Sequence, residues 1–249
     1  MPEMNENQMN EEDLRQFICE IGRRMYEREY VVSTDGNIST RLTNQGYLFT
    51  PTGCCLGEIE PEDVVATDGD GNVREGEGEP TAEWRLHLVT YGLRPDIGAV
   101  VHAHPPWVLA ASAAGFSLAR PVLPEVLYHI GSIPTADYAI PSSEESAQAI
   151  RGWISDHDAV VMDRHGCVTV DKTLLGAYRK LERVEQTARL VVRVKTASVL
   201  KILPRNEVEK IRERRRADGM NPASILPDPS REFGEQAKSD YSSPEDEGE

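Results

Sequence analysis

The chain has 249 residues, of which 39% are hydrophobic and 28% charged, and its formal net charge is −15. This composition is typical of a soluble globular protein, and the chain holds no apolar run of about 18 residues or more that would indicate a membrane span. The acidic first residues lack the apolar segment of a secretory signal, and the four cysteines form no CxxC pair, so we expect a cytoplasmic protein with reduced thiols.

The negative charge lies mainly at the two ends of the chain. Residues 1–13 carry −5 and residues 228–249 carry −6, which leaves −4 for the body between them. The only basic run, residues 210–216, is typical of the solvated face of a helix, so we expect no nucleic-acid partner and no membrane partner. The expected organisation is a flexible acidic N-terminus over 1–10, a folded domain over 11–216, and a disordered acidic tail over 217–249.

The first predicted element in chain order is an amphipathic helix over 11–29, where apolar residues recur at helical spacing after a capping Asn10. Residues 31–75 change to short β-branched or aromatic segments between Gly, Asn, Asp and Pro, which is typical of strands and tight turns. The later elements are predicted as helix 81–93, strand 99–103, helix 106–114, helix 142–156 with a capping box of Ser142 and Glu145, strand 159–162, helix 173–203 stopped by Pro204, and a basic helix over 205–216. Because strands and helices interleave, the expected fold is an α/β single domain with three layers, helix–sheet–helix.

Two histidines, His102 and His104, lie two residues apart at the end of the predicted strand AVVHA. Side chains at positions i and i+2 of a strand leave on the same face, so both imidazoles project side by side. Burying two adjacent imidazoles requires compensation, which favours a pair of metal ligands over two ordinary hydrogen-bonded histidines. Neutral imidazole nitrogens are typical ligands of Zn²⁺ and similar divalent ions.

A third ligand has to come from elsewhere in the chain. His165 follows the predicted strand AVVMD, at a strand end where the sites of layered α/β folds gather, and His129 is the alternative that spacing alone leaves open. Cys167 offers a sulfur ligand, although a small buried hydrophobe is its more common role. Three histidines leave a coordination position open for a substrate, and a carboxylate base is then required nearby. Four glutamates that precede the histidine pair are candidates for this base: Glu75, Glu77, Glu79 and Glu83.

Five motifs in order make the chain similar to the class II aldolase/adducin family, and within it to the L-fuculose-1-phosphate aldolases. They are Gly36-Asn37-Ile38-Ser39, Thr50-Pro51-Thr52-Gly53, Glu83-Trp84-Arg85-Leu86-His87, RPDIGAVVHAHPP from Arg94, and His165-Gly166. The resemblance covers residues 11–200 and implies the three-layer α/β domain of the class II aldolase type.

The resemblance also implies the residues of the site. The implied metal ligands are His102, His104 and His165, with one Zn²⁺ per chain and Mn²⁺ or Co²⁺ as alternatives. The implied catalytic residues are Glu83, as acid/base, and Tyr128, at a position similar to an active-site tyrosine. The implied substrate-binding residues are Gly36, Asn37, Thr52, Gly53 and Thr81, in turns where glycine lets backbone N–H groups approach an anion.

Two positions depart from the family pattern. Thr81-Ala82 stands where relatives often have Ser-Ser, and Leu56 stands where many have a lysine. Both changes remove donors for an anion, so whether the substrate carries a phosphate stays open.

The implied activity is that of an aldolase, a carbon–carbon lyase of carbohydrate metabolism. It would cleave a sugar phosphate or a related hydroxy-ketone by a retro-aldol step through a metal-bound enediolate. A decarboxylase or an epimerase of the same family uses the same enediolate, and the identity of the product separates these alternatives. An adducin-like assembly protein without catalysis is the alternative of another class; such members tend to lose the three histidines and the glutamate, which are all present here. The resemblance further implies a small-molecule substrate and a homotetramer with active sites between subunits.

Overall fold

One mixed sheet forms the centre of the protein. The computed structural model describes residues 6, 9–43, 46–76 and 78–220, and within them eight strands pair in the order β4-β3-β2-β1-β5-β8-β7-β6. Their bounds are β1 Asn37–Arg41, β2 Tyr47–Phe49, β3 Val65–Thr67, β4 Val73–Glu75, β5 Ala99–Ala103, β6 Thr135–Ala136, β7 Ala159–Met162 and β8 Gly166–Asp171. Neighbouring strands are antiparallel, except that β6 runs parallel to β7.

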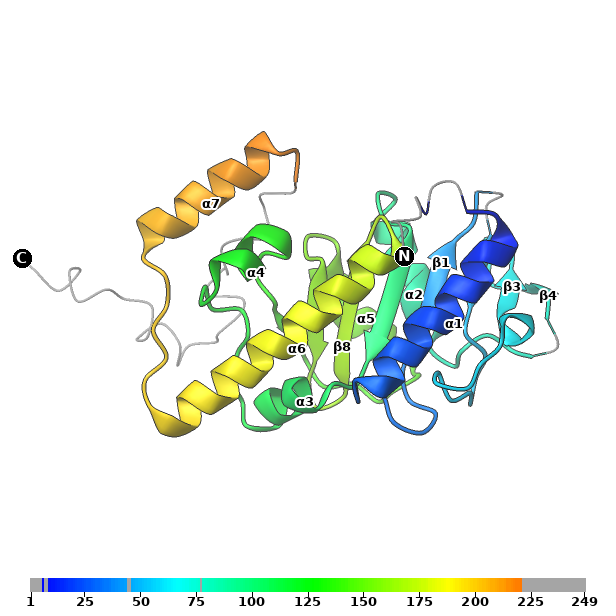
Figure 1. Ribbon diagram of the computed structural model, residues 1–249, viewed down its shortest axis with the longest axis horizontal. Helices are drawn as coiled ribbons and strands as arrows, with labels where there is room; N and C mark the ends of the chain where they lie inside the picture. The colour runs from blue at the N-terminus through cyan, green and yellow to red at the C-terminus, as the bar shows by residue number, and fades with distance from the viewer. Residues whose placement is uncertain (1–5, 7–8, 44–45, 77, 221–249) are drawn as a thin grey trace, which may run out of the picture.

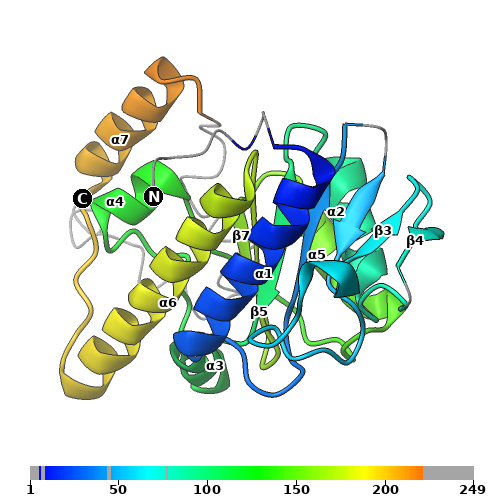
Figure 2. The same cartoon turned by 45° about the vertical axis from the view of Figure 1, so that its right-hand side comes forward.

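Helices cover both faces of the sheet. Their bounds are α1 Glu11–Glu27, α2 Trp84–Leu93, α3 Pro106–Ala113, α4 Pro124–His129, α5 Glu144–Ile154, α6 Leu174–Ala197 and α7 Arg205–Ala217, with a short 3₁₀ helix, η2, over Pro61–Asp63. Figure 1 shows α1 and α6 crossing one face of the sheet while α2 and α5 lie behind it, and the turned view of Figure 2 shows the same layers. Each face has its own apolar core, one including Ile18, Val101 and Leu181 and the other including Leu86, Val100 and Ile150. The expected three-layer α/β domain is therefore confirmed.

Most of the predicted elements are present, but several helix ends differ: α1 ends at Glu27 and not at 29, and α2 begins at Trp84 and not at 81. The capping box of α1 forms between Asn10 and Asp13, as helix-start chemistry predicts. The cap of α5 is Ser143, whose hydroxyl accepts from the Ser146 amide, and the predicted Ser142 lies one residue earlier with a φ of 58°. Helix α6 ends at Ala197 and not at Leu203, because the β-branched and hydroxyl residues that follow have low helix propensity and Val199, 82% exposed, gains nothing from packing.

Three elements were not predicted from the sequence: α4, β6 and β8. The basic helix predicted over 205–216 is present as α7, and it packs its Val208 against Leu127 of α4. Figure 1 shows α7 and α4 side by side at one end of the molecule.

The two predicted tails fall largely outside the described residues, which omit 1–5, 7–8 and 221–249. Glu6 is described, and its carboxylate accepts hydrogen bonds from the Leu174 and Leu175 amides at the start of α6, at 2.6 and 2.9 Å. All four cysteines are free thiols, as expected. Among the described residues, no helix combines the length and the apolarity needed to cross a bilayer.

Candidate metal centre

The central strand β5 positions the histidine pair. Along β5, Ala99, Val101 and Ala103 pack into the core beneath α1 and α6, whereas Val100 packs into the core beneath α2 and α5. His102 shares the face of Val100, because side chains alternate along a strand. It pairs in register with Asn37 of β1 on one side and with Val168 of β8 on the other, and its imidazole is fully buried.

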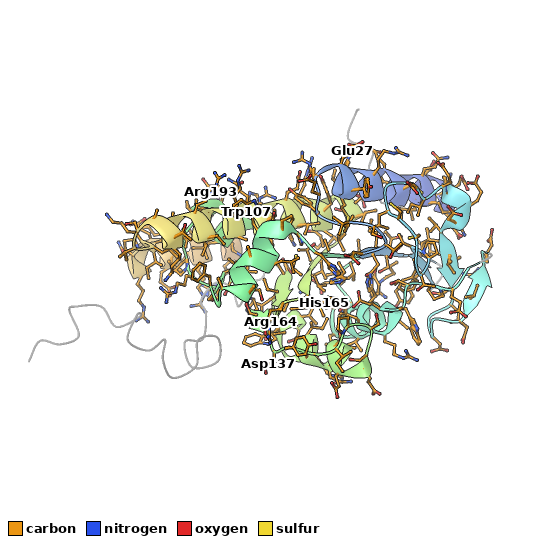
Figure 3. All side chains as sticks on the ribbon, turned by 90° about the horizontal axis from the view of Figure 1, so that it is seen from below. Glu27, Trp107, Asp137, Arg164, His165 and Arg193 are labelled. Atoms are coloured by element: carbon orange, nitrogen blue, oxygen red, sulfur yellow. The ribbon has the colours of Figure 1, made fainter. Side chains whose placement is uncertain are left out.

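His165 reaches the pair from the tight turn between β7 and β8, which Figure 3 shows together with the neighbouring Arg164. The next residue, Gly166, makes this approach possible. A Cβ at Gly166 would lie 2.3 Å from the Ala103 carbonyl oxygen and 2.8 Å from the His104 ring. Glycine is therefore required for β8 to lie close beside the end of β5, and this contact brings His165 against the other two histidines.

The three imidazoles form a compact triangle. Their ring centroids lie 4.8, 4.8 and 4.9 Å apart, and one nitrogen of each ring lies within 4.8 Å of the other two. Within the part of the chain that the structure describes, this is the one group of three possible ligand residues that qualifies as a metal site. The structure brings His165, and not His129 or Cys167, into the group.

The contacts on the outer side of the first two histidines fit a bound cation. The Nδ1 atom of His102 lies 3.1 Å from the Cys167 carbonyl oxygen, and the Nδ1 atom of His104 lies 3.3 Å from an Asp35 carboxylate oxygen. Both partners can only accept, so each Nδ1 carries the proton and each Nε2 presents a lone pair. These two Nε2 atoms face one another at 3.0 Å. Two lone pairs at this distance repel unless a positive centre lies between them, and a divalent ion would supply it.

Glu83 lies against the same histidines from the start of α2, where it is the N-cap residue. One carboxylate oxygen, Oε2, lies 3.1 Å from His102 Nε2 and accepts a hydrogen bond from the Asn37 amide at 2.9 Å. The other, Oε1, lies 3.7 Å from His165 Nε2 and is buried without a hydrogen-bond partner. A buried carboxylate oxygen with no donor fits a metal or a substrate proton as its partner.

The charge states suit this use. Burial lowers the pKa of His102 to about 3, so its imidazole is neutral, as a metal ligand must be. Burial opposes ionisation of Glu83, whereas positive charge at His102 or His165 and the hydrogen bond from the Asn37 amide favour it, and the balance lowers its pKa. Glu83 is thus an ionised carboxylate inside a largely buried site.

The predicted substrate-binding residues gather near Glu83. Thr81 lies two residues before Glu83, the N-cap of α2, and its hydroxyl accepts from the Glu83 amide at 3.3 Å. Thr52 and Gly53 form an exposed turn, and Gly53 has a φ of 71° with open space around its α-carbon. Glycine is needed at position 36 because a Cβ there would lie 2.4 Å from Val31 and 3.0 Å from the His102 carbonyl oxygen.

Two residues differ from the roles expected of them. The side chain of Asn37 is buried and engaged with Glu83 and His87, so it is not free to donate to a substrate. Tyr128 lies on α4, where its hydroxyl donates to Asp218 at 2.6 Å and makes no hydrogen bond to the histidines or to Glu83. Leu56, at the position of the missing lysine, is fully buried in the core beneath α1.

Four residues around the site were not found from sequence: Asp35, Ser39, His87 and Tyr91. Ser39 and His87 occur in the family motifs, but neither was assigned a role. The available signal was the four-residue spacing of Glu83, His87 and Tyr91, which places all three on one face of α2.

Comparisons with known proteins give one matching family model and several similar proteins. The family model described as Class II Aldolase and Adducin N-terminal domain matches residues 16–192. The chain is 38% identical over 178 residues to the L-fuculose phosphate aldolase of Methanococcus maripaludis (strain S2), covering 72% of this chain and 95% of that protein. It is 31% identical over 185 residues to the 3-oxo-tetronate 4-phosphate decarboxylase of Escherichia coli (strain K12), covering 73% and 87%.

Solved structures resemble the whole domain. An L-fuculose 1-phosphate aldolase structure superposes with a TM-score of 0.76 at 29% identity, covering 82% of this chain and 96% of that one. YgbL from Escherichia coli superposes with a TM-score of 0.76 at 30% identity, covering 81% and 98%.

Proposed function

The chain belongs to the class II aldolase and adducin family, and from this we propose that it is a metal-dependent aldolase that cleaves a sugar phosphate or a related hydroxy-ketone. The observation that carries the proposal is the pairing of the three-histidine group with the Glu83 carboxylate, whose buried Oε1 lies 3.7 Å from His165 Nε2 without a hydrogen-bond donor. An assembly protein would gain nothing from burying this carboxylate beside three imidazoles, since each buried polar group costs free energy unless it is compensated.

We propose that His102, His104 and His165 hold one Zn²⁺ per chain, with Mn²⁺ or Co²⁺ as alternatives. Three imidazole ligands are the donor set of open, catalytic zinc sites. The ion supplies Lewis acidity that stabilises the negative charge developing on the substrate's carbonyl oxygen. The side chains of the protein supply the remaining steps.

In the retro-aldol direction, the bond between the two carbons breaks and its electron pair stays on the carbonyl fragment, which becomes an enediolate. The carbon of that fragment must then gain a proton. Glu83, ionised at rest, would first take up a proton, balanced by the one lost from the departing hydroxyl, and then deliver it to this carbon; in the synthetic direction the carboxylate removes it. The Asn37 amide holds the Oε2 atom of Glu83, which leaves Oε1 for this proton transfer. We propose that Thr52, Gly53 and Thr81 bind the anionic end of the substrate. The Thr52 and Thr81 amides already donate to the Glu79 and Thr50 carbonyl oxygens, so the two threonine hydroxyls would make these contacts.

The hydroxyl proton of the departing aldehyde requires a second acceptor. We propose Tyr128 of a neighbouring subunit for this role, in the homotetramer with active sites between subunits that the family resemblance implies. In its own subunit, Tyr128 lies on α4, which packs against α7, and its hydroxyl donates to Asp218 just after α7.

The test uses zinc-loaded protein and two phosphorylated probes. L-Fuculose phosphate should release an aldehyde, whereas 3-oxo-tetronate 4-phosphate should release little carbon dioxide. The reverse pattern would replace the aldolase assignment with that of a decarboxylase, the activity for which the Escherichia coli relative is named. Cleavage of neither probe, together with no zinc binding by wild-type protein, would favour the adducin-like alternative.

Three variants locate the activity. His102→Ala should lose the zinc and all turnover, and Glu83→Gln should keep the zinc and lose most turnover, because it removes the proton-transfer group and keeps its shape. The matched control is Glu79→Gln, which changes an exposed carboxylate four residues earlier and should retain both zinc and activity. Full activity in Glu83→Gln would refute the acid/base assignment.

A further inference from the structure

A line of polar side chains runs through the otherwise apolar contact between α2 and β1. Glu83, His87 and Tyr91 are spaced by four residues and share one face of α2, while Asn37 and Ser39 are spaced by two and share one face of β1. Side chains from the two elements alternate along the line, in the order Glu83, Asn37, His87, Ser39, Tyr91. All five side chains are buried, with exposures of 7, 4, 0, 0 and 2% in that order.

Each neighbouring pair in this line is hydrogen-bonded. The Asn37 amide nitrogen lies 2.9 Å from Glu83 Oε2, and the Asn37 amide oxygen lies 2.6 Å from His87 Nε2. The other ring nitrogen of His87 lies 2.6 Å from the Ser39 hydroxyl, which lies 2.9 Å from the Tyr91 hydroxyl.

The direction of every hydrogen bond in this line of side chains follows from the carboxylate at its Glu83 end. A carboxylate only accepts, so the NH₂ group of Asn37 faces Glu83 and its oxygen faces His87. That oxygen requires a donor, so His87 carries its proton on Nε2 and accepts at Nδ1. Ser39 must then donate to His87, and Tyr91 must donate to Ser39. One arrangement therefore satisfies all the links, and a buried network of this kind is rigid because breaking any link leaves a polar group unpaired.

We propose that His87, Ser39 and Tyr91 are positioning residues for the reaction: through this chain they lock the Asn37 amide, and with it the direction in which Glu83 presents its free oxygen Oε1. None of the three touches the histidine group or the exposed substrate turn, so they act through Asn37 alone. The proposal rests on the proposed function, in which Glu83 transfers the proton.

Kinetics of three variants test this role. His87→Gln disturbs the two links of His87, Ser39→Ala removes the two links of Ser39, and Tyr91→Phe removes one. Loss of such an outer partner lowers activity by about 10- to 100-fold. The loss in kcat should be largest for His87→Gln and smallest for Tyr91→Phe, because the break then lies progressively farther from Glu83. KM should stay unchanged, since none of these side chains binds the substrate.

The matched control is Thr90→Val, which removes a buried hydroxyl from the same helix. This hydroxyl donates to the Leu86 carbonyl oxygen at 2.8 Å and lies outside the chain. The control should be less stable than wild type but equal to it in kcat. Unchanged kcat in both His87→Gln and Tyr91→Phe, on folded and zinc-loaded protein, would overturn the proposal, and so would an equal loss in the control.

A second measurement tests the chain without any substrate. Nitrogen NMR of the histidine-labelled wild-type protein should show His87 with a protonated Nε2 and an unprotonated Nδ1. A proton on Nδ1 would require the Asn37 amide to turn its oxygen toward Glu83, and the positioning proposal would then be wrong. If wild type cleaves neither probe, the proposed function fails by itself, while the NMR result still decides whether the hydrogen-bond chain exists.

Discussion

The contact between Asp35 and His104 predicts a measurable share of the zinc affinity. An Asp35 carboxylate oxygen lies 3.3 Å from Nδ1 of His104, whose opposite nitrogen faces the centre of the three-histidine group. A carboxylate on the outer nitrogen of a metal-binding imidazole fixes the ring and raises the basicity of the inner nitrogen. Asp35→Ala removes both effects.

The size of this effect follows from the exposure of Asp35. A buried hydrogen bond to a charged group contributes about 1.5–3 kcal/mol. The Asp35 side chain is 44% exposed, so water competes and the contribution falls to about 1.4 kcal/mol. This corresponds to about a tenfold rise in the dissociation constant for zinc. Asp35→Asn keeps an acceptor oxygen without the charge and should lie between wild type and Asp35→Ala.

The assay is competition for zinc against a chelator of known affinity. Asp137→Ala is the control, because it removes an exposed carboxylate from the loop after β6, which Figure 3 labels on the same side of the molecule as His165. If Asp35→Ala binds zinc as tightly as Asp137→Ala, then Asp35 does not support His104 and the reasoning is refuted.

Three further predictions concern the surroundings of the site. Burial lowers the pKa of His87 from 6.5 to about 4. Between these two values His87 binds a proton in the unfolded chain but not in the folded protein. The free energy of unfolding should therefore fall by about 2 kcal/mol between about pH 7 and 5. Urea titrations should show a flatter pH dependence for His87→Gln, and equal slopes would contradict the assignment. Gly166→Ala should weaken zinc binding and cost about 1–3 kcal/mol of stability, because its Cβ would lie 2.3 Å from the Ala103 carbonyl oxygen; wild-type zinc affinity in this variant would show that the close approach is dispensable. Glu185→Ala should lower the free energy of unfolding by about 1–3 kcal/mol, since it leaves two backbone amides at the start of α3 without their acceptor, and an unchanged urea midpoint would disprove this.

Local patterns were sufficient for much of the fold. Helices α1, α2, α3 and α7 follow from apolar spacing, caps and prolines, which act within a few residues. The end of α6 could not be placed this way, because a helix stops where packing ceases to support it and Pro204 is only the latest point at which it can stop. Strand β8 was missed because its pairing with β5 is a contact between segments far apart in the chain.

For the site, the sequence by itself determined the histidine pair, since the pleat of a strand sends positions 102 and 104 to one face whatever the rest of the chain does. The choice of Glu83 among four glutamates, and of His165 over His129, came from family resemblance and not from spacing. The tertiary structure places both beside the pair, because β5 lies between β1 and β8 and thereby brings α2 and the β7–β8 turn to the same end of the strand. The line of polar side chains from Glu83 to Tyr91 also depends on the tertiary structure. The spacing of four residues on α2 and of two on β1 can be seen in the sequence, but only the packing of α2 on β1 brings the two sets of side chains into contact.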